Sequence, residues 1–589
     1  MHFEELKGWT KTQAINWVRR FPALDSRLQI LRREGLARGG AYPEWRRILG
    51  TSRAAWESAT KETANGPRVL MATGTGSHLA AMQMETTLAA ALTLRGAQVE
   101  VLLCDKLLPG CQMCEPRFFP DTAHFAKHGP RKDLCGHCYE PARANYGELG
   151  LPIHAYSDGL SESDLRFAEE TAKQVRLTEI EHFALDGLNL GEHAKAGALR
   201  FFARATIDGE PDAETVLRRY LEAAILTAMS VSAVLKRGSF DVAVFHHGIY
   251  VPQGIVGEVC RRQGVRVVNW NPAYRASCFI FSHEETYHHS LMDEPVSVWE
   301  NMYWSPERDI AITEYLRSRW QGENDWIRFQ GKPFFEKDRI FAEIGCDPDR
   351  PIIGCLTNVL WDAQLHYPGN AFADMLEWLM HTVRYFQQRP EVQLVIRVHP
   401  AEIAGSVPTR QPVVDELKKA FSGLPPNVFL VPPESRISTY ALAELCDSAI
   451  IYGTKTGVEL TSFGIPVIVA GEAWIRNKGV TTDANSPAEY DRILDDLPAG
   501  ARLPLDMVTR ARKYAYHFFL RRMIPIRIFK KGPGLPPYVF DGALADLAVG
   551  QDAGLDCVCN GILEHAAFVF EGDDAEAVAR NSQVFRTGG

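Results

Sequence analysis

Four features are missing from this 589-residue sequence, and each absence argues against one class of protein. No stretch reaches the ~18 uninterrupted apolar residues that a membrane-spanning helix needs. The opening segment, MHFEELKGWT, has no apolar core of a secretory signal. Basic residues do not dominate, since 64 Lys and Arg stand against 73 Asp and Glu, which makes a dedicated nucleic-acid binder a poor candidate. The 12 cysteines follow no disulfide-framework spacing, as expected of a cytoplasmic protein.

What is present describes a folded protein of more than one domain. Hydrophobic residues make up 46% of the chain and charged residues 23%, which excludes a disordered or fibrous chain. At ~100–200 residues per domain, the length favours two large lobes with additions. We therefore expect a cytoplasmic protein, and a peripheral contact with the inner face of a membrane stays open.

The first 66 residues alternate apolar and charged positions at helical spacing. Leu28, Leu31 and Trp45 are among the residues that this pattern would bury. It predicts an N-terminal helical cap.

A repeating order of strand, turn and helix follows. A strand over 68–72, a glycine-containing turn, a helix over 79–95 and a strand over 98–103 make a βαβ unit, which requires a parallel sheet. The same order returns over 242–269 and again over 352–470. The pattern predicts an α/β protein with two Rossmann-like lobes facing one cleft.

The predicted divisions follow these blocks. They are a helical cap over 1–66, an N-terminal Rossmann-like lobe over 67–345 with a cysteine-rich insertion over 104–140, a C-terminal Rossmann-like lobe over 346–530 and a C-terminal extension over 531–589. Ligands of open α/β sheets bind at the carboxyl ends of the strands, so chemistry is expected in the loops after the strands.

One such loop carries hydroxyl groups and a positive charge. After an apolar strand over 448–452, Thr454, Lys455 and Thr456 open a predicted helix that also carries Glu459. Helix N-termini attract phosphate, and a carboxylate one turn along could take a pair of sugar hydroxyls. The alternative is an ordinary capping box between Thr456 and Glu459.

A second loop of this kind follows the predicted strand over 393–398. Arg397 and His399 are alternate residues at the end of this strand, and Pro400 stops it. An arginine and a protonated histidine could neutralise a diphosphate or phosphodiester leaving group.

These two segments carry a resemblance to a known family. Together with Trp474-Ile-Arg-Asn-Lys-Gly-Val-Thr-Thr482 and Ser486-Pro-Ala-Glu-Tyr490, they resemble the capsule polysaccharide biosynthesis family over residues 350–495. That family includes transferases that build bacterial surface glycans on the two-lobed GT-B fold. In such folds the C-terminal lobe holds the nucleotide-sugar donor. The resemblance implies donor contacts from Asn358, Arg397, His399, Thr454, Lys455, Thr456, Glu459 and Lys478.

The N-terminal glycine turn is similar to the first loop of other GT-B transferases, where the acceptor is gripped. Expected acceptor contacts are Gly74, Thr75, Gly76, Ser77 and His247. His78, or Asp362 in the other lobe, is the candidate base for the acceptor hydroxyl. A histidine that only packs at the loop is an equal alternative for His78.

A cysteine cluster predicts a metal site. Cys111 and Cys114, followed after 20 residues by Cys135 and Cys138, have the spacing of a four-thiolate zinc knuckle or ribbon. An iron–sulfur cluster on the same ligands is the second candidate. Four thiolates leave no open position, so we expect a structural ion that pins the insertion on the acceptor side.

The resulting hypothesis is a glycosyltransferase without a catalytic metal. It would move a sugar from a nucleotide-sugar to a bacterial surface polysaccharide or lipid-linked glycan. Arg397, His399 and Lys455 would stabilise the leaving phosphate. The alternatives are a nucleotide-sugar 2-epimerase on the same fold, a non-catalytic glycan assembly or export factor and, more remotely, redox chemistry at the thiols.

Overall fold

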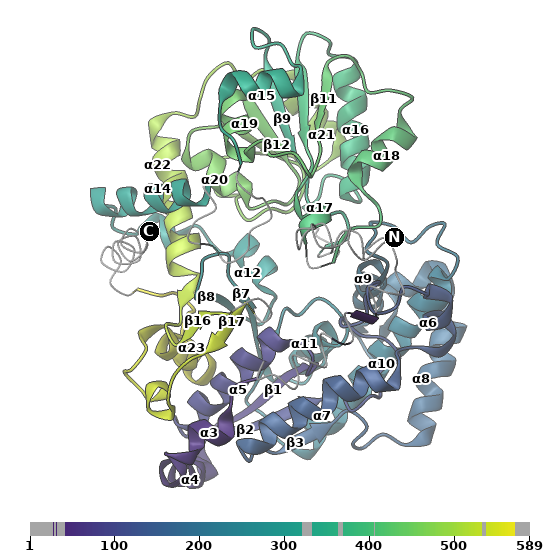
Figure 1. The fold of residues 1–589 in the computed structure, drawn as a ribbon, viewed down its shortest axis with the longest axis vertical. Helices are drawn as coiled ribbons and strands as arrows, with labels where there is room; N and C mark the ends of the chain where they lie inside the picture. The colour runs from purple at the N-terminus through teal and green to yellow at the C-terminus, as the bar shows by residue number, and fades with distance from the viewer. Residues whose placement is uncertain are drawn as a thin grey trace, which may run out of the picture. The chain divides into compact units, whose positions relative to one another are not determined.

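The computed structural model describes residues 27, 28, 31, 42–320, 325, 333–362, 369–405, 407–532 and 537–571. Two compact units divide the chain (Figure 1). The first comprises the chain to Ala203, then Ile207–Val267 and Ile528–Gln551. The second comprises Arg204–Thr206, Val268–Arg527 and the chain from Asp552.

The first unit is built on parallel strands. β1 (Arg68–Gly74) lies between β2 (Gln98–Leu103) and β6 (Val242–His246), and β3 (Ile153–Ala155) pairs with β2. Their near-continuous apolar sequences fit a sheet that is covered on both faces. Helices α9 (Gly191–Phe202), α10 (Ala213–Arg237) and α11 (Gln253–Arg262) share one hydrophobic core with Leu70, Ala72 and Leu102 of this sheet.

Helix α5 (Leu79–Thr93), which follows the glycine turn, is buried from Ala81 to Thr93. Such burial needs cover on the side away from the sheet, and a distant segment supplies it. The hairpin of β16 (Phe529–Lys531) and β17 (Tyr538–Phe540) lies against α5, where the Tyr538 hydroxyl donates to the Ala80 carbonyl oxygen at 2.9 Å. Part of the predicted C-terminal extension thus completes the first unit.

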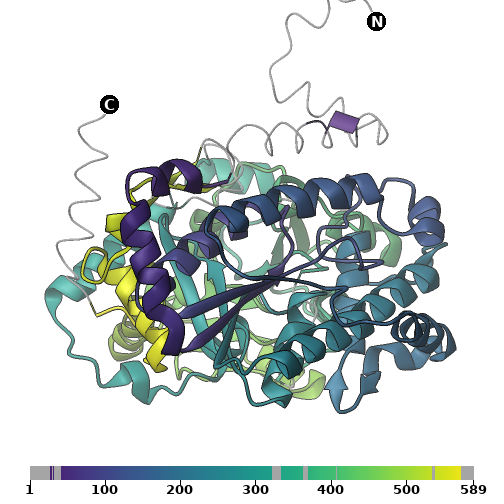
Figure 2. The ribbon, with the colours of Figure 1, turned by 90° about the horizontal axis from the view of Figure 1, so that it is seen from below.

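The predicted N-terminal cap is helical where it is described. Helices α3 (Trp45–Gly50) and α4 (Arg53–Glu62) precede β1 (Figure 2). The fully buried Trp45 stacks on Phe540 at 5.6 Å between ring centroids. Leu28 and Leu31 are 43% and 60% exposed, contrary to the predicted burial. Most of the predicted cap before Tyr42 lies outside the described residues.

The second unit contains a six-stranded parallel sheet in the order β11-β10-β9-β12-β13-β14. Its strands are β9 (Ile352–Leu356), β10 (Gln393–Arg397), β11 (Val428–Val431), β12 (Ser448–Ile451), β13 (Val467–Val469) and β14 (Thr482–Asp483). Numbered along the chain this order is 3-2-1-4-5-6, that of a doubly wound nucleotide-binding sheet.

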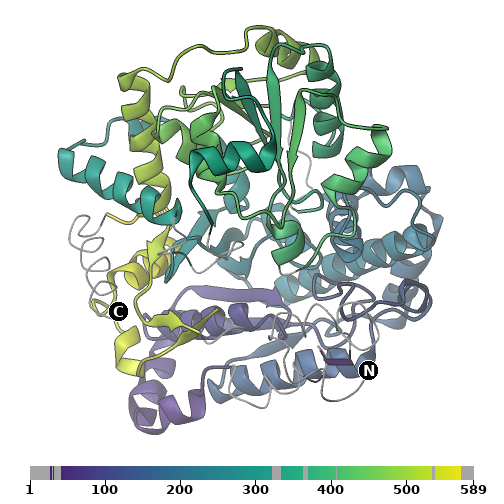
Figure 3. The same ribbon diagram turned by 45° about the horizontal axis from the view of Figure 1, so that its top comes forward.

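Helices cover both faces of this sheet (Figure 3). Leu394 and Ile396 pack with α16 (Met375–Gln387), α18 (Val413–Ala420) and α21 (Pro487–Asp495), whereas Val395 packs with α15 (Lys337–Ile344) and α19 (Thr439–Leu445). This alternation is the two-residue period of a strand. The predicted α/β class with two Rossmann-like sheets is confirmed.

The division between the units falls after Val267, whereas the sequence pattern places it at residue 345. The intervening segment packs in the second unit because β8 (Cys278–His283), α13 (Ser297–Glu300) and α14 (Pro306–Trp320) share a core with α22 (Leu505–Tyr516). β8 also pairs antiparallel with β7 (Arg266–Pro272) and with β15 (Ile524–Pro525). Contacts with α22, 200 residues later, are not visible in local sequence patterns.

Across the described ranges, none of the helices is long and apolar enough to cross a bilayer.

Candidate functional site

The order of the second sheet marks one edge as the expected ligand site. The chain leaves β9 toward β10 and returns beyond β9 to β12, so the topology reverses between the carboxyl ends of β9 and β12. Ligands of doubly wound sheets bind at such a reversal. Thr357 and Asn358 follow β9, and the turn Gly453–Lys455 follows β12.

The guanidinium donors of Arg397 are used by backbone carbonyl oxygens rather than at this edge. Its guanidinium donates hydrogen bonds to the carbonyl oxygens of Val398, Pro432 and Ser435, at 3.2, 2.6 and 3.3 Å, and only 2% of the residue is exposed. Burial lowers the pKa of Arg397 to about 10. Arg397 therefore stabilises the loop after β11 through these hydrogen bonds. The sequence pattern predicts instead that Arg397 contacts phosphate.

His399 lies at the edge, but as a neutral imidazole. Burial, with the nearby charges of Lys455 and Arg397, lowers the pKa of His399 to about 3. Its Nδ1 accepts from the Ala401 N–H at 3.1 Å, so the ring proton belongs on Nε2. Its backbone N–H donates to the Thr357 hydroxyl at 3.1 Å. His399 can therefore donate a hydrogen bond from Nε2 as a neutral ring, whereas the sequence pattern predicts a protonated, positively charged histidine.

The turn after β12 is held by its own hydroxyl groups. Thr454 Oγ1 and Thr456 Oγ1 lie 3.1 Å apart, and Thr454 Oγ1 also accepts from the Thr456 N–H at 3.4 Å. Helix α20 (Thr456–Ser462) starts here without a side-chain cap from its N-cap residue, Lys455. The Thr456–Glu459 capping box considered as an alternative is therefore not formed.

Glu459 is the centre of a buried charge network. Its carboxylate is fully buried, and Oε1 lies 3.0 Å from Lys455 Nζ and 3.3 Å from Arg319 Nη2. Arg319 also pairs with Asp325, which accepts from the Tyr315 hydroxyl at 3.1 Å. Two cations thus face two carboxylates in a water-poor environment, where such pairs interact strongly.

The network determines the ionisation of its members. Burial opposes the charge on Glu459, but Arg319 and Lys455 outweigh it and lower the pKa of this carboxyl to about 2. Burial and Arg319 lower the pKa of Lys455, which Glu459 opposes. Glu459, expected to take sugar hydroxyls, instead positions Lys455.

Lys455 is the member of the network with the most exposed side chain, at 19%. Its Nζ lies 4.8 Å from the centroid of the Tyr274 ring, a cation–π distance, and its charge acts on His399. Lysine, histidine and the threonine hydroxyls are thus gathered at the edge between β9 and β12.

Three other predicted site residues have different environments. Lys478 is buried and donates to the carbonyl oxygens of Met292 and Glu294 at 2.9 and 3.0 Å, which holds two chain segments together. Asn358 follows β9 directly, and its backbone N–H donates to Met375 Sδ at 3.2 Å. Asp362 is exposed. Asn358 thus lies at the edge between β9 and β12, whereas Lys478 donates its hydrogen bonds to the segment around Met292.

Glu402, three residues after His399, predicts a pH-dependent stability. It is 1% exposed, and burial raises its pKa to about 7, although the Val413 N–H donates to it at 3.3 Å. The folded state therefore binds this proton more tightly than the unfolded state, and the stabilisation is complete below pH 4.5 and lost as pH rises through 7.

Glu402→Gln should accordingly raise the melting temperature at pH 8 and change it little at pH 5. The stabilisation at pH 8 is at most about 3 kcal/mol, from 1.36 kcal/mol per pKa unit. Glu444→Gln, at an exposed position of α19, is the control. Equal melting-temperature changes at both pH values would contradict the assignment.

The first unit has a corresponding edge after β1 and β6. The Gln253 side chain donates to the Thr73 carbonyl oxygen at 2.9 Å and to Thr75 Oγ1 at 3.4 Å, and the His246 N–H donates to Thr73 Oγ1 at 2.8 Å. These hydrogen bonds connect the end of β1 and its turn with the end of β6 and the start of α11. Gly74 has a φ of +71°, which favours glycine, and a Cβ there would lie 2.6 Å from the Tyr156 hydroxyl.

Three histidines gather at this edge. The rings of His78 and His246 are 4.5 Å apart, and those of His246 and His247 are 5.5 Å apart. Burial, with the charge of Arg200, lowers the pKa of His247 to about 4. The structure thus brings His78 and His247 together with the glycine turn, as expected, and makes His247 neutral.

Gly76 lets the turn approach helix α7 (Lys132–Glu148). A Cβ on Gly76 would lie 2.2 Å from the Cys138 carbonyl oxygen and 2.3 Å from the Ala142 Cβ. Gly76→Ala should therefore destabilise the protein by about 2 kcal/mol through overpacking. Gly147→Ala, in α7 with no atom within 4 Å of the new Cβ, should be neutral or stabilising in the same thermal unfolding experiment. Equal stability of the two variants would contradict this close approach.

The four cysteines of the predicted metal site lie in the first unit and are not joined by disulfide bonds. Cys135 and Cys138 lie on α7. Where the structure is described, no group of three or more His, Cys, Asp or Glu side chains is arranged to hold a metal ion. The predicted four-thiolate geometry is therefore not formed.

Sequence reasoning missed the partners of Glu459. Arg319 is near the end of α14, 140 residues before Glu459, and Asp325 follows it. Tyr274, whose ring lies beside Lys455 Nζ, is still earlier in the chain. An arginine in the last turn of a helix is a common surface feature, so no local signal distinguishes Arg319.

Comparisons with known proteins give only remote likenesses. No family model and no curated protein matches the chain. A KpsC beta Kdo 2,4 transferase of Thermosulfurimonas dismutans is 13% identical, with 46% of this chain and 79% of that chain covered and a TM-score of 0.31. A UDP-GlcNAc 2-epimerase from Neisseria meningitidis is 10% identical, with 76% and 95% covered and a TM-score of 0.24. The spinosyn rhamnosyltransferase SpnG is 14% identical, with 76% and 95% covered and a TM-score of 0.23. With TM-scores this low, these likenesses carry no argument about function.

Proposed function

We propose that the protein is a glycosyltransferase whose nucleotide-sugar donor binds at the carboxyl edge of β9 and β12. One observation carries the proposal. At the reversal of a doubly wound sheet, a partly exposed lysine is held by a buried carboxylate beside a neutral histidine and three threonine hydroxyls. Such an edge suits a phosphate that carries a nucleoside on one side and a sugar on the other.

In the proposed mechanism, Lys455 stabilises the charge that develops on the leaving phosphate. Its ammonium would take the part that a divalent cation takes in other transferases. Glu459 contacts Lys455, and Arg319 contacts Glu459, in a buried network. Both therefore act as positioning residues for Lys455. His399 donates from Nε2, and Asn358 and the threonine hydroxyls add further hydrogen bonds.

Arg397 and Lys478 have a structural role in this proposal. Both use their donors on backbone carbonyl oxygens, which fixes the loop after β11 and the segment around Met292. Their substitution would act on stability before it acts on donor binding.

The acceptor is proposed to be a bacterial surface polysaccharide or a lipid-linked glycan, gripped by Gly74–Ser77 and His247 of the first unit. Its hydroxyl oxygen would form the new bond to the anomeric carbon while the bond from that carbon to the phosphate oxygen breaks. The proton would pass to His78 or Asp362, and the nucleotide would leave with the bonding electrons. The proposed location is the cytoplasm, at the inner face of the membrane.

Incubation of the full chain with CMP-, UDP-, GDP- and dTDP-sugars, with and without surface-glycan acceptors, tests this function. Sugar transfer that requires an acceptor would support it. Formation of an epimer from the donor alone would replace it by the 2-epimerase alternative. Donor binding without turnover on any acceptor would favour the assembly factor.

His399→Ala should lower turnover at least about tenfold without unfolding the protein, since one hydrogen-bond donor to the phosphate is lost. His399→Gln should retain more activity than His399→Ala, because a neutral amide can still donate. His381→Ala, at the surface pair with Asp491, is the control. Full activity of a folded His399→Ala variant would remove His399 from the mechanism.

A further inference from the structure

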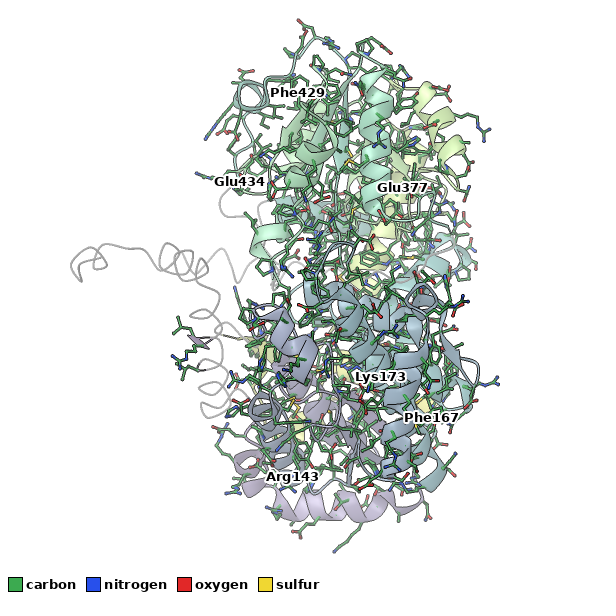
Figure 4. All side chains as sticks on the ribbon, turned by 90° about the vertical axis from the view of Figure 1, so that its right-hand side faces the viewer. Arg143, Phe167, Lys173, Glu377, Phe429 and Glu434 are labelled. Carbon is green, nitrogen blue, oxygen red and sulfur yellow. The ribbon has the colours of Figure 1, made fainter. Side chains whose placement is uncertain are left out.

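The cysteines near the glycine turn lie closer together than unrelated thiols would. Cys111 Sγ and Cys114 Sγ are 4.0 Å apart in the loop after β2. Cys135 and Cys138 are one helical turn apart on α7, a helix whose Arg143 points to solvent (Figure 4). Cys111 lies near enough to Cys135 for its charge to act on that thiol.

The distance between the first two sulfur atoms fits a metal ion. A tetrahedral zinc ion with zinc–sulfur bonds of about 2.3 Å separates its ligand sulfurs by about 3.8 Å. The 4.0 Å between Cys111 and Cys114 is close to this edge and far longer than a disulfide bond. A residue spacing of three places both members of each pair on one side of a turn.

A backbone donor and two lysines lie beside the second cysteine pair. The Ser77 N–H donates to Cys138 Sγ at 3.2 Å, which stabilises charge on that sulfur. Lys132 Nζ donates to the Lys106 carbonyl oxygen at 2.7 Å, and both lysines lie near Cys135, although burial raises the pKa of this thiol to about 12. Cations and a backbone donor thus surround the second pair.

We propose that Cys111, Cys114, Cys135 and Cys138 together bind one structural zinc ion. Since the side chains are not yet arranged as a complete ligand set, binding requires the thiols of α7 to turn toward the first pair. The ion displaces the thiol protons as it binds, and zinc does not change its oxidation state.

The zinc ion would connect two segments of the first unit, and both contact the glycine turn. Cys111 and Cys114 belong to the loop after β2, and Cys135 and Cys138 belong to α7, which packs against Gly76. The Cys104 N–H donates to the Gly74 carbonyl oxygen at 3.0 Å, so the same loop also contacts the glycine turn. Zinc would therefore stabilise this turn without taking part in chemistry, and the inference does not depend on glycosyl transfer.

Metal analysis of the purified full chain tests the inference. We expect about one zinc per chain in the wild type, and less than about one fifth of that in Cys111→Ser and Cys138→Ser. Cys557→Ser, a half-buried thiol of α23 (Ala553–Glu564) in the second unit, should keep the zinc of the wild type. Zinc should also protect the four cysteines from alkylation, read peptide by peptide.

A second measurement covers the case in which the serine variants do not fold. Wild-type protein loaded with cobalt(II) should show thiolate-to-cobalt charge transfer and the intense visible bands of a tetrahedral site. Wild-type protein without zinc, and without these bands after cobalt loading, would overturn the proposal. Iron and sulfide in place of zinc would overturn the choice of ion.

Discussion

Lys455→Met is expected to lower kcat/KM for the nucleotide-sugar at least about 100-fold, the loss typical of one charged contact to a developing negative charge. The Nζ of Lys455 is the cation that the β9–β12 edge presents with a partly exposed side chain. Methionine is an unbranched side chain only one heavy atom shorter than lysine, so the loss of the charge, with its cation–π contact to Tyr274, is the main change.

The matched control is Lys418→Met, an exposed lysine of α18 in the same unit. It removes the same charge from the chain without touching the edge, so its kinetics should equal those of the wild type. Lys455→Arg should recover part of the lost activity. If Lys455→Met and Lys418→Met had the same kcat/KM, the leaving-group role of Lys455 would be refuted.

Glu459→Gln should destabilise the protein by about 3 kcal/mol, because it leaves the buried Arg319 and Lys455 facing each other without the carboxylate between them. Glutamine has the same shape, so no cavity is made and the loss reports the charge. Thermal unfolding of the full chain, followed with a probe for the second unit, measures the effect.

Glu444→Gln is the control, because it removes a carboxylate from an exposed position of the same unit. A second reading comes from double variants. Lys455→Met should recover part of the stability lost in Glu459→Gln, since it removes the cation that Glu459 alone compensates among the four charged residues of the network. Additive losses in the double variant would show that the three residues do not form one network.

Local patterns predicted the strands that build the site with little error. β2 has the predicted bounds, and β10 and β12 each end one residue before the predicted strand, because short, mainly apolar runs between turn-forming residues describe a buried strand. The βαβ order then fixes which loops meet at one edge. For this reason Asn358, His399 and Lys455 could be placed together from the sequence.

The role of each charged side chain could not be predicted in the same way. Arg397 is at the expected position, but its donors are used by carbonyl oxygens of the loop after β11, which approach only in the folded chain. Likewise, Glu459 has the spacing of a capping residue and is instead bound by Arg319 of a distant helix. Burial and partners, not position in the sequence, decide whether a cation is available.

The unit boundary shows the same limitation. Residues 268–345 follow the first block of α/β units in the chain, so the sequence pattern assigns them to that block. Their apolar side chains, among them Trp299 and Ile312, pack instead with α22. Helix-to-helix contacts across 200 residues leave no local signal.

Hydrogen–deuterium exchange of the full chain, with and without a saturating nucleotide-sugar, tests the central claim most directly. We expect the donor to protect the backbone N–H groups in the segments 357–358, 399–401 (where Pro400 has none) and 453–456, and Lys455→Met to abolish this protection. Protection confined to other segments, with these three unchanged, would contradict a donor site at the β9–β12 edge.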